Sequence, residues 1–189
     1  MAEKIDFHLG FTYNERRKPS LIDVEGHIEP GRFVVLCGCS GCGKSTLLRC
    51  INHLIPEFYE GELTGVCRID GKDISGLRIG EVGKRVASVF QDPRAQFFTV
   101  NSSSELAFGL ENFGLSHDEI VERVNEGFRK FGLDSLKNRS VFELSSGERQ
   151  LVAILSAWAL ATDVIVMDEP TANLDQRAIA KLHDMLSEL

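Results

Sequence analysis

The sequence has few tryptophan and tyrosine residues and no long apolar segment. It holds one tryptophan and two tyrosines among 189 residues. No apolar run approaches the roughly 20 residues of a membrane-spanning helix. The first residues, Met1–Asp6, lack the apolar stretch of a signal peptide. We therefore expect a cytoplasmic protein, which would act as a peripheral subunit on the inner face of the cell membrane if it serves a membrane.

An excess of positive charge is also missing. The sequence has 21 lysine and arginine residues against 28 acidic ones, so its formal net charge is −7. This balance provides no general electrostatic reason to bind nucleic acid, and no nucleic-acid partner is expected. Hydrophobic residues make up 43% of the chain, which indicates a globular protein with a proper core.

Cysteine is concentrated near one loop. Three of the five cysteines, Cys37, Cys39 and Cys42, form C-x-C-x-x-C. A disulfide framework is not expected in a cytosolic chain. A metal site is one interpretation, although no fourth ligand is present in this stretch. The other is chemical vulnerability, because thiols near a helix start and a lysine react readily.

The strongest pattern in the sequence is a phosphate-binding loop. Residues Gly38–Ser45 match G-x-x-x-x-G-K-[ST]. The apolar run Phe33–Leu36 before it predicts a buried strand, and Thr46–Ile51 after it predicts a helix. Glycines allow the backbone to turn tightly and to present several amides, and the helix start favours an anion. Lys44 can then reach the β- and γ-phosphates, while the Ser45 hydroxyl can ligate Mg²⁺.

A second strong pattern is the segment Asp163–Pro170. Its four consecutive apolar residues predict a strand of a parallel sheet that is covered on both faces. Asp168 and Glu169 follow at the strand end, where open α/β sheets bind ligands. Asp168 can hold Mg²⁺, and Glu169 can act as general base on the attacking water. A structural cap is the alternative explanation for the acidic pair.

Local patterns predict further strands and turns. Alternating apolar residues predict strands at Lys4–Phe11 and Leu21–Ile28. Glu60–Gly65 is rich in turn residues, and Val66–Gly71 predicts a strand that ends in Asp-Gly. Val86–Phe90 predicts a short buried strand.

Helices are predicted in the second half of the chain. Ser116 and Glu119 form a capping box, and Gly132 stops the helix that follows. Apolar spacing also predicts helices at Glu105–Phe113 and Leu151–Trp158. A last helix is predicted at Gln176–Leu189.

Three weaker features each have two interpretations. Tyr13 either packs half-buried or stacks on an adenine ring. Gln91 lies just after a predicted strand. Its polar side chain either reaches the site that the strand borders or has no functional role, and alone this signal is weak. The segment Ser145–Gly147 is either a plain helix cap or an anion-binding site. Such a site would use a hydroxyl, the backbone of a glycine and the positive end of a helix.

Together these elements, in this order, resemble the ATP-binding cassette (ABC) ATPase family. The resemblance rests on the phosphate loop, the segments Leu144–Gln150 and Val164–Pro170, and Ala172–Asp175. Within the family, the segment Val89–Val100 followed by Glu105–Asn112 resembles the energy-coupling-factor (ECF) branch of cobalt and vitamin importers.

The resemblance implies an α/β fold. It comprises a P-loop NTPase core with a mostly parallel sheet, an N-terminal antiparallel β subdomain and an inserted α-helical subdomain. It also implies a single ABC ATPase domain in three parts. Residues 1–93 would form the nucleotide-binding core with the β subdomain, 94–162 the helical insert and signature helix, and 163–189 the Walker B strand, D-loop and following helix.

The resemblance assigns roles to residues of this sequence. The catalytic residues would be Glu169 and Gln91, and Mg²⁺ would be held by Ser45, Gln91 and Asp168. Ser145, Ser146 and Gly147 would cap the γ-phosphate of ATP held by the opposite subunit, and Asp175 would lie at the dimer seam. The implied nucleotide-binding residues are Tyr13, Gly38, Cys39, Ser40, Gly41, Cys42, Gly43, Lys44, Ser45 and Thr46.

The implied function is that of an ATP-hydrolysing subunit that powers a membrane transporter, with ECF-type uptake of a vitamin or metal ion as the expected case. Its partners would be a second ABC ATPase in a head-to-tail dimer and integral membrane components. The alternatives are a ribosome- or DNA-associated ABC ATPase and a non-hydrolysing ATP-binding regulatory fragment.

The sequence departs from the family pattern at three places. Ser146 stands where the family usually has glycine, and Ala172–Asp175 differs mildly from the commoner Ser-Ala-Leu-Asp form. The sequence ends at Leu189, before the expected switch histidine, which suggests a truncated cassette or the first part of a longer one. The chain as given is expected to bind ATP and still hydrolyse it poorly.

Modification of Cys39 and Cys42 with a thiol reagent should abolish nucleotide binding, because an added group would occupy the loop that wraps the phosphates. Bound ATP should protect both thiols. Binding of a fluorescent ATP analogue before and after labelling measures the effect, and unchanged binding after full modification would rule the prediction out.

Overall fold

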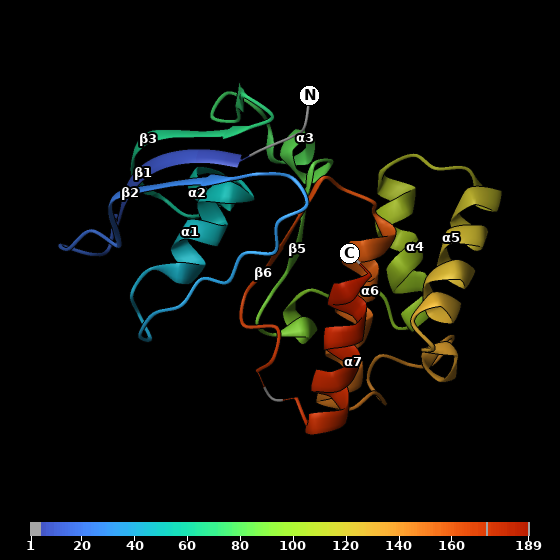
Figure 1. The fold of residues 1–189 in the computed structure, drawn as a ribbon. Helices are drawn as coiled ribbons and strands as arrows, with labels where there is room; N and C mark the ends of the chain where they lie inside the picture. The colour runs from blue at the N-terminus through green and yellow to red at the C-terminus, as the bar shows by residue number, and fades with distance from the viewer. Residues whose placement is uncertain (1–4, 173, 189) are drawn as a thin grey trace. The chain divides into compact units, whose positions relative to one another are not determined.

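The computed structural model describes residues 5–172 and 174–188. They form two compact units, one that ends at Val86 and one that begins at Ala87 (Figure 1). Lys4, Asn173 and Leu189, which belong to predicted segments, lie outside the described residues. No helix in the described part of the chain is both long and apolar enough to cross a membrane.

The first unit is built on an antiparallel sheet in which β1 lies centrally. The strand order is β2-β1-β3-β4. β1 pairs with β3 along its whole length, from Ile5 opposite Ile69 to Tyr13 opposite Gly61. The strands are β1 (Ile5–Tyr13), β2 (Leu21–Ile28), β3 (Gly61–Ile69) and β4 (Lys72–Asp73).

The predicted turn at Glu60–Gly65 is wrong, because β3 begins at Gly61. Pairing with the full length of β1 outweighs the local turn preference. Gly65 takes a left-handed φ of 87°. A Cβ added there would lie 1.9 Å from the carbonyl oxygen of His8. The glycine that suggested a turn is therefore needed for close approach of two strands.

Three helices complete the first unit, and α1 and α2 lie on one face of the sheet (Figure 1). α1 confirms the helix predicted after the phosphate loop and buries Leu47, Cys50 and Ile51. The helices are α1 (Lys44–Ile51), α2 (Leu54–Glu57) and α3 (Ile79–Gly83).

The predicted buried strand at Phe33–Leu36 is wrong in this structure. The segment has no regular secondary structure, and the side chains of Phe33 and Val35 are 71% and 65% exposed. Apolar and β-branched residues favour a strand where a neighbouring strand accepts their hydrogen bonds. Among the described residues, neither sheet includes this segment.

The second unit packs helices around α6 and beside a pair of strands. β5 (Val86–Val89) and β6 (Val164–Met167) are hydrogen-bonded neighbours. They confirm the two short strands predicted before Gln91 and Asp168. The helices are α4 (Ser102–Asn112), α5 (His117–Lys130), α6 (Ser146–Ala159) and α7 (Gln176–Ser187), with short 3-10 turns η1 (Pro93–Ala95) and η2 (Asp134–Leu136).

α6 is the centre of this unit. Its residues Val152–Leu155 are completely buried, and the helix packs against α4, α5 and α7. A helix buried on all sides must be apolar around its circumference. The neighbouring helix α5 begins with the predicted capping box of Ser116 and Glu119.

A buried carboxylate orders the segment before α4. Glu105 is 6% exposed, and its Oε2 accepts hydrogen bonds from the Phe98 amide at 3.1 Å and the Thr99 amide at 2.9 Å. The Thr99 hydroxyl donates to the same oxygen at 2.9 Å. With its backbone held in this way, Phe98 leaves its side chain 76% exposed. A charged group accepts such bonds more strongly than a neutral one.

Candidate functional site

The phosphate loop of the first unit is shaped by two glycines with left-handed backbone. Gly41 has φ 77° and Gly43 has φ 102°. A Cβ on Gly43 would lie 2.6 Å from the carbonyl oxygen of Ser20, so no other residue fits without displacing the start of β2. Gly43 is the N-cap of α1 and makes no side-chain cap hydrogen bond. The start of a helix is a place where an anion is favoured.

Lys44 folds back over this loop. Its Nζ donates to the carbonyl oxygens of Gly38 at 3.0 Å and Cys39 at 3.2 Å. The ammonium is thus held beside the same backbone that presents its amides. This arrangement places a positive charge next to backbone amide donors, which suits phosphate binding.

The structure brings Tyr13 to the helix that follows the phosphate loop. The Tyr13 hydroxyl lies 3.2 Å from Oγ1 of Thr46 and accepts a hydrogen bond from Arg49 at 3.1 Å. The ring is partly buried, and its edge-to-face neighbours are Phe11 and Tyr59. The ring is therefore firmly oriented, which suits both packing and stacking on a base.

The five thiols divide into two groups. Cys37, Cys39 and Cys42 are exposed, whereas Cys50 and Cys67 are buried. Burial raises the pKa of both the Cys50 and the Cys67 thiol to about 12. A thiol reagent can therefore reach the exposed thiols of Cys37, Cys39 and Cys42. Burial keeps the thiols of Cys50 and Cys67 protonated, and therefore unreactive.

In the second unit, the structure brings the two predicted catalytic residues together. Nε2 of Gln91 donates to Oε2 of Glu169 at 2.9 Å. The strand ends are aligned because the Asp168 amide donates to the carbonyl oxygen of Val89 at 2.9 Å. Glu169 adopts φ 49° immediately before Pro170, a backbone conformation that is uncommon for a side-chain-bearing residue and frequent at functional sites.

The segment Ser145–Gly147 opens α6 as a capping box. The Ser145 hydroxyl accepts the Glu148 amide at 3.2 Å, and the Ser145 amide donates to Glu148 at 2.7 Å. The cap interpretation is thus confirmed, and the Ser145 side chain is paired with Glu148 of the same box. A Cβ on Gly147 would lie 3.1 Å from Cβ of Ala178, so α7 packs closely at this point.

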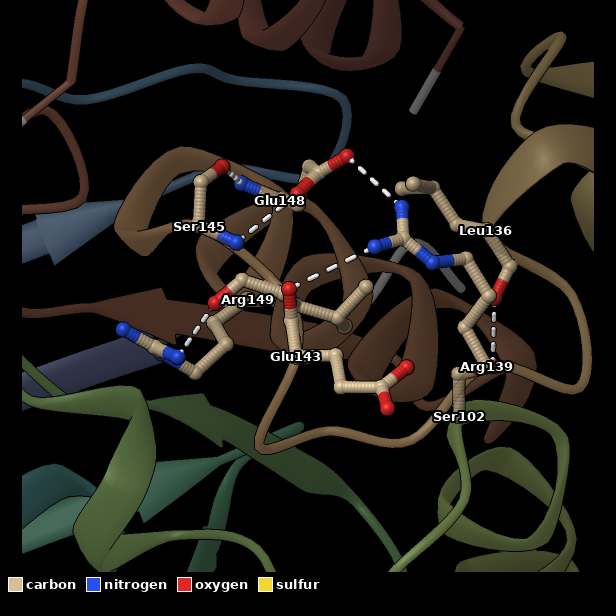
Figure 2. A network of polar contacts seen from close by, with 8 residues as sticks. Ser102, Leu136, Arg139, Glu143, Ser145, Glu148 and Arg149 are labelled. Carbon is tan, nitrogen blue, oxygen red and sulfur yellow. Dashed lines mark hydrogen bonds and ion pairs between the residues drawn. The ribbon is translucent and has the colours of Figure 1, made fainter.

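Sequence reasoning missed a polar network that supports this segment (Figure 2). Arg139 pairs with Glu148 at 3.1 Å and donates to the carbonyl oxygen of Glu143 at 3.3 Å. Arg149 donates to the carbonyl oxygen of Leu144. The Ser145 amide, with help from Arg139, lowers the pKa of Glu148. The S-x-x-E spacing of Ser145 and Glu148 could have indicated the box; Arg139 has no comparable local signal.

Comparison with known proteins decides the family. The sequence profile described as "ABC transporter" matches residues 21–172. The chain belongs to the ABC transporter family. A putative ABC transporter ATP-binding protein of Treponema denticola is 41% identical over 96% of this chain, and one of Methanosarcina mazei is 41% identical over 95%. The chain spans 37% and 30% of these relatives' own lengths.

A solved structure supports the same assignment. The cbiO1 protein of Clostridium perfringens, described as part of the ABC transporter complex cbiONQ, superposes with a TM-score of 0.83 at 29% identity. The overlap covers 97% of this chain and 72% of that one. The predicted fold class, an α/β P-loop NTPase with an N-terminal antiparallel sheet, is confirmed.

The predicted site residues of this cassette form groups within each unit. Tyr13 joins Thr46 beside the phosphate loop, and Gln91 joins Glu169 beside Asp168. Asp175 caps α7 by accepting the Ala178 amide at 2.8 Å. Its role at a dimer seam, the functional assignments of the other residues and the three-part domain division stay predictions.

The predicted Mg²⁺ ligands of the cassette have suitable chemistry. Ser45 offers a hydroxyl, Asp168 a carboxylate and Gln91 an amide oxygen, and oxygen donors are what Mg²⁺ prefers. Gln91 donates its amide nitrogen to Glu169, which leaves its amide oxygen available to a cation.

Glu148→Ala should reduce the free energy of unfolding near neutral pH by about 1 kcal/mol, the usual value of a lost hydrogen bond. The folded-state pKa of Glu148 lies below its ordinary value of 4.5. Its contribution is therefore complete above that pH and is lost as the pH falls through the folded-state pKa. Urea titrations of both proteins at a series of pH values measure the difference, which should shrink in acid. A pH-independent difference would contradict the prediction.

Proposed function

We propose that the protein containing this chain binds ATP with Mg²⁺ and hydrolyses it to power a membrane transporter, in an ECF-type uptake system for a vitamin or metal ion. The observation that carries the proposal is the Gln91–Glu169 hydrogen bond at the ends of β5 and β6, directly beside Asp168. A general base needs an orienting partner, and Gln91 supplies it. The likeness to cbiO1 supports the uptake branch.

In this proposal the phosphate loop positions the nucleotide. The amides of Gly38–Thr46 and the ammonium of Lys44 hold the phosphates, and Tyr13 supports the adenine. Glu169 accepts a proton from the water that attacks the γ-phosphorus while Gln91 holds the carboxylate and the water in place. Ser45, Asp168 and Gln91 would hold Mg²⁺, which would supply positive charge to the phosphate oxygens.

We further propose that the protein acts in a head-to-tail dimer. Ser145, Ser146 and Gly147 would contact the γ-phosphate of ATP held by the opposite cassette. The capping box supports this role because it fixes the Ser145 hydroxyl at an exposed helix start, where an anion is favoured. Asp175, which begins α7, would lie at the dimer seam.

Glu169→Gln should lower the rate of ATP hydrolysis roughly 10²- to 10⁴-fold, because an amide cannot take the proton. ATP affinity should be unchanged, and the variant should accumulate an ATP-bound dimer. Steady-state phosphate release, nucleotide titration and size-exclusion chromatography of the full-length protein provide the three readouts. Glu143→Gln, which makes the same change at an exposed residue of the same unit, serves as the control. Full turnover in Glu169→Gln would remove Glu169 from the base role.

Three exposed apolar side chains on two joined segments of the second unit, which we call the apolar patch, support a membrane partner. The patch consists of Phe98, Val100 and Phe142, which are 76%, 66% and 77% exposed. The segments that carry it are joined because the Val141 amide donates to the carbonyl oxygen of Val100 at 3.0 Å. Apolar side chains on rigid backbone are the usual anchors of a protein interface. We propose that this patch contacts the integral membrane components from the cytoplasmic side.

Phe98→Ser should release the full-length protein from the membrane fraction of its own cells without changing its ATP affinity, because an apolar anchor is lost. The measurement is the distribution of the protein between membrane and soluble fractions. Phe58→Ser removes a similarly exposed phenylalanine, 69%, from the other unit and should have no effect. Equal membrane retention of both variants would exclude the patch as the contact.

A further inference from the structure

A cationic cleft lies beside the phosphate loop within the first unit. Its volume is about 530 Å³. One wall is the turn between β1 and β2, and the opposite wall is Gly41 and Cys42 at the tip of the loop. The turn contributes Arg16, Arg17 and Lys18, and none of the residues lining the cleft is acidic. A concave site with one sign of charge concentrates ligands of the opposite sign.

Backbone hydrogen bonds hold the turn that forms one wall. The Arg16 amide donates to the carbonyl oxygen of Tyr13 at 2.9 Å, and the Ser20 amide donates to that of Phe11 at 2.7 Å. At the base, Gly43 has room only for hydrogen against the Ser20 carbonyl oxygen. The start of the phosphate loop helix and the end of the cationic turn are therefore in direct contact, so the cleft is preorganised for a ligand of the loop.

Arg16 connects this cleft with the aromatic residue. Its guanidinium carbon lies 5.4 Å from the centre of the Tyr13 ring, within the range of a cation–π contact. The same side chain lines the cleft that Gly41 borders. A planar guanidinium can rest against an aromatic surface and direct a fork of several N–H groups to phosphate oxygens, whereas an ammonium offers a point charge without that fork.

We infer that Arg16 is a nucleotide-binding residue, which contacts the polyphosphate of the nucleotide from the side of the cleft opposite the phosphate loop. Tyr13 positions the guanidinium for this contact. Arg17 and Lys18 add positive charge to the cleft and so strengthen its attraction for phosphates. The ligand class is a nucleoside di- or triphosphate, and the phosphates carry the recognition. This inference rests on the proposed ATP-binding function and adds a specificity-determining residue to it.

Arg16→Ala in the full-length protein should weaken ATP binding about tenfold, the effect of one charge-assisted hydrogen bond. Adenosine, which has no phosphate, should lose little affinity. Arg16→Lys should recover only part of the loss, because it keeps the charge without the planar fork. The affinities are measured by competition against a fluorescent ATP analogue, and the salt dependence of ATP binding should be smaller in Arg16→Ala than in the parent protein.

Arg68→Ala is the matched control, because it removes an exposed cation from β3 in the same unit and should leave affinity unchanged. Circular dichroism shows whether each variant folds. Equal ATP affinity in Arg16→Ala and the parent would overturn the inference, as would tighter binding or an equal loss for adenosine. Absence of ATP binding in the parent itself would instead overturn the proposed function, so the two failures are distinguishable.

Discussion

The chemistry proposed for the second unit depends on one backbone hydrogen bond, from the Asp168 amide to the carbonyl oxygen of Val89. It sets the register between the ends of β5 and β6. Gln91 lies two residues beyond Val89, and Glu169 lies one beyond Asp168, so this register brings their side chains within 2.9 Å. The left-handed backbone at Glu169 then directs the carboxylate. A shift of one residue in the pairing would displace one side chain from the other by about 3.3 Å along the strands.

Much of this arrangement could be predicted from the sequence because its signals are local. The capping box of Ser116 and Glu119, the apolar face of α6 and the short strands before Gln91 and Asp168 each depend on residues close in sequence. The spacing of the phosphate loop is likewise a local pattern with a known geometry. These features correspond to elements whose bounds agree with the expectation to within a few residues.

The features that could not be predicted depend on tertiary context. Phe33–Leu36 has the composition of a strand, yet a strand also needs a neighbour that no local pattern specifies. Glu60–Gly65 has the composition of a turn, yet β1 provides an uninterrupted partner for it. The burial of Glu105 and the pairing of Arg139 with Glu148 involve partners only six to nine residues away, but they depend on how the intervening loops fold, which no periodic or capping pattern specifies. Charged residues ordinarily indicate surface, so their burial or pairing has no local signal.

The triple acceptor at Glu105 has a mechanical consequence. The segment around Phe98 and Thr99 has little freedom to bend, because three donors converge on one buried oxygen that belongs to α4. The aromatic ring of Phe98 also stacks on Phe108 of the same helix, with 5.1 Å between ring centres. The Phe98 ring and its backbone are thus both fastened to α4. Since α4 packs on α6, which Ser145 caps, an unbroken series of packed and hydrogen-bonded elements joins the exposed ring to that serine.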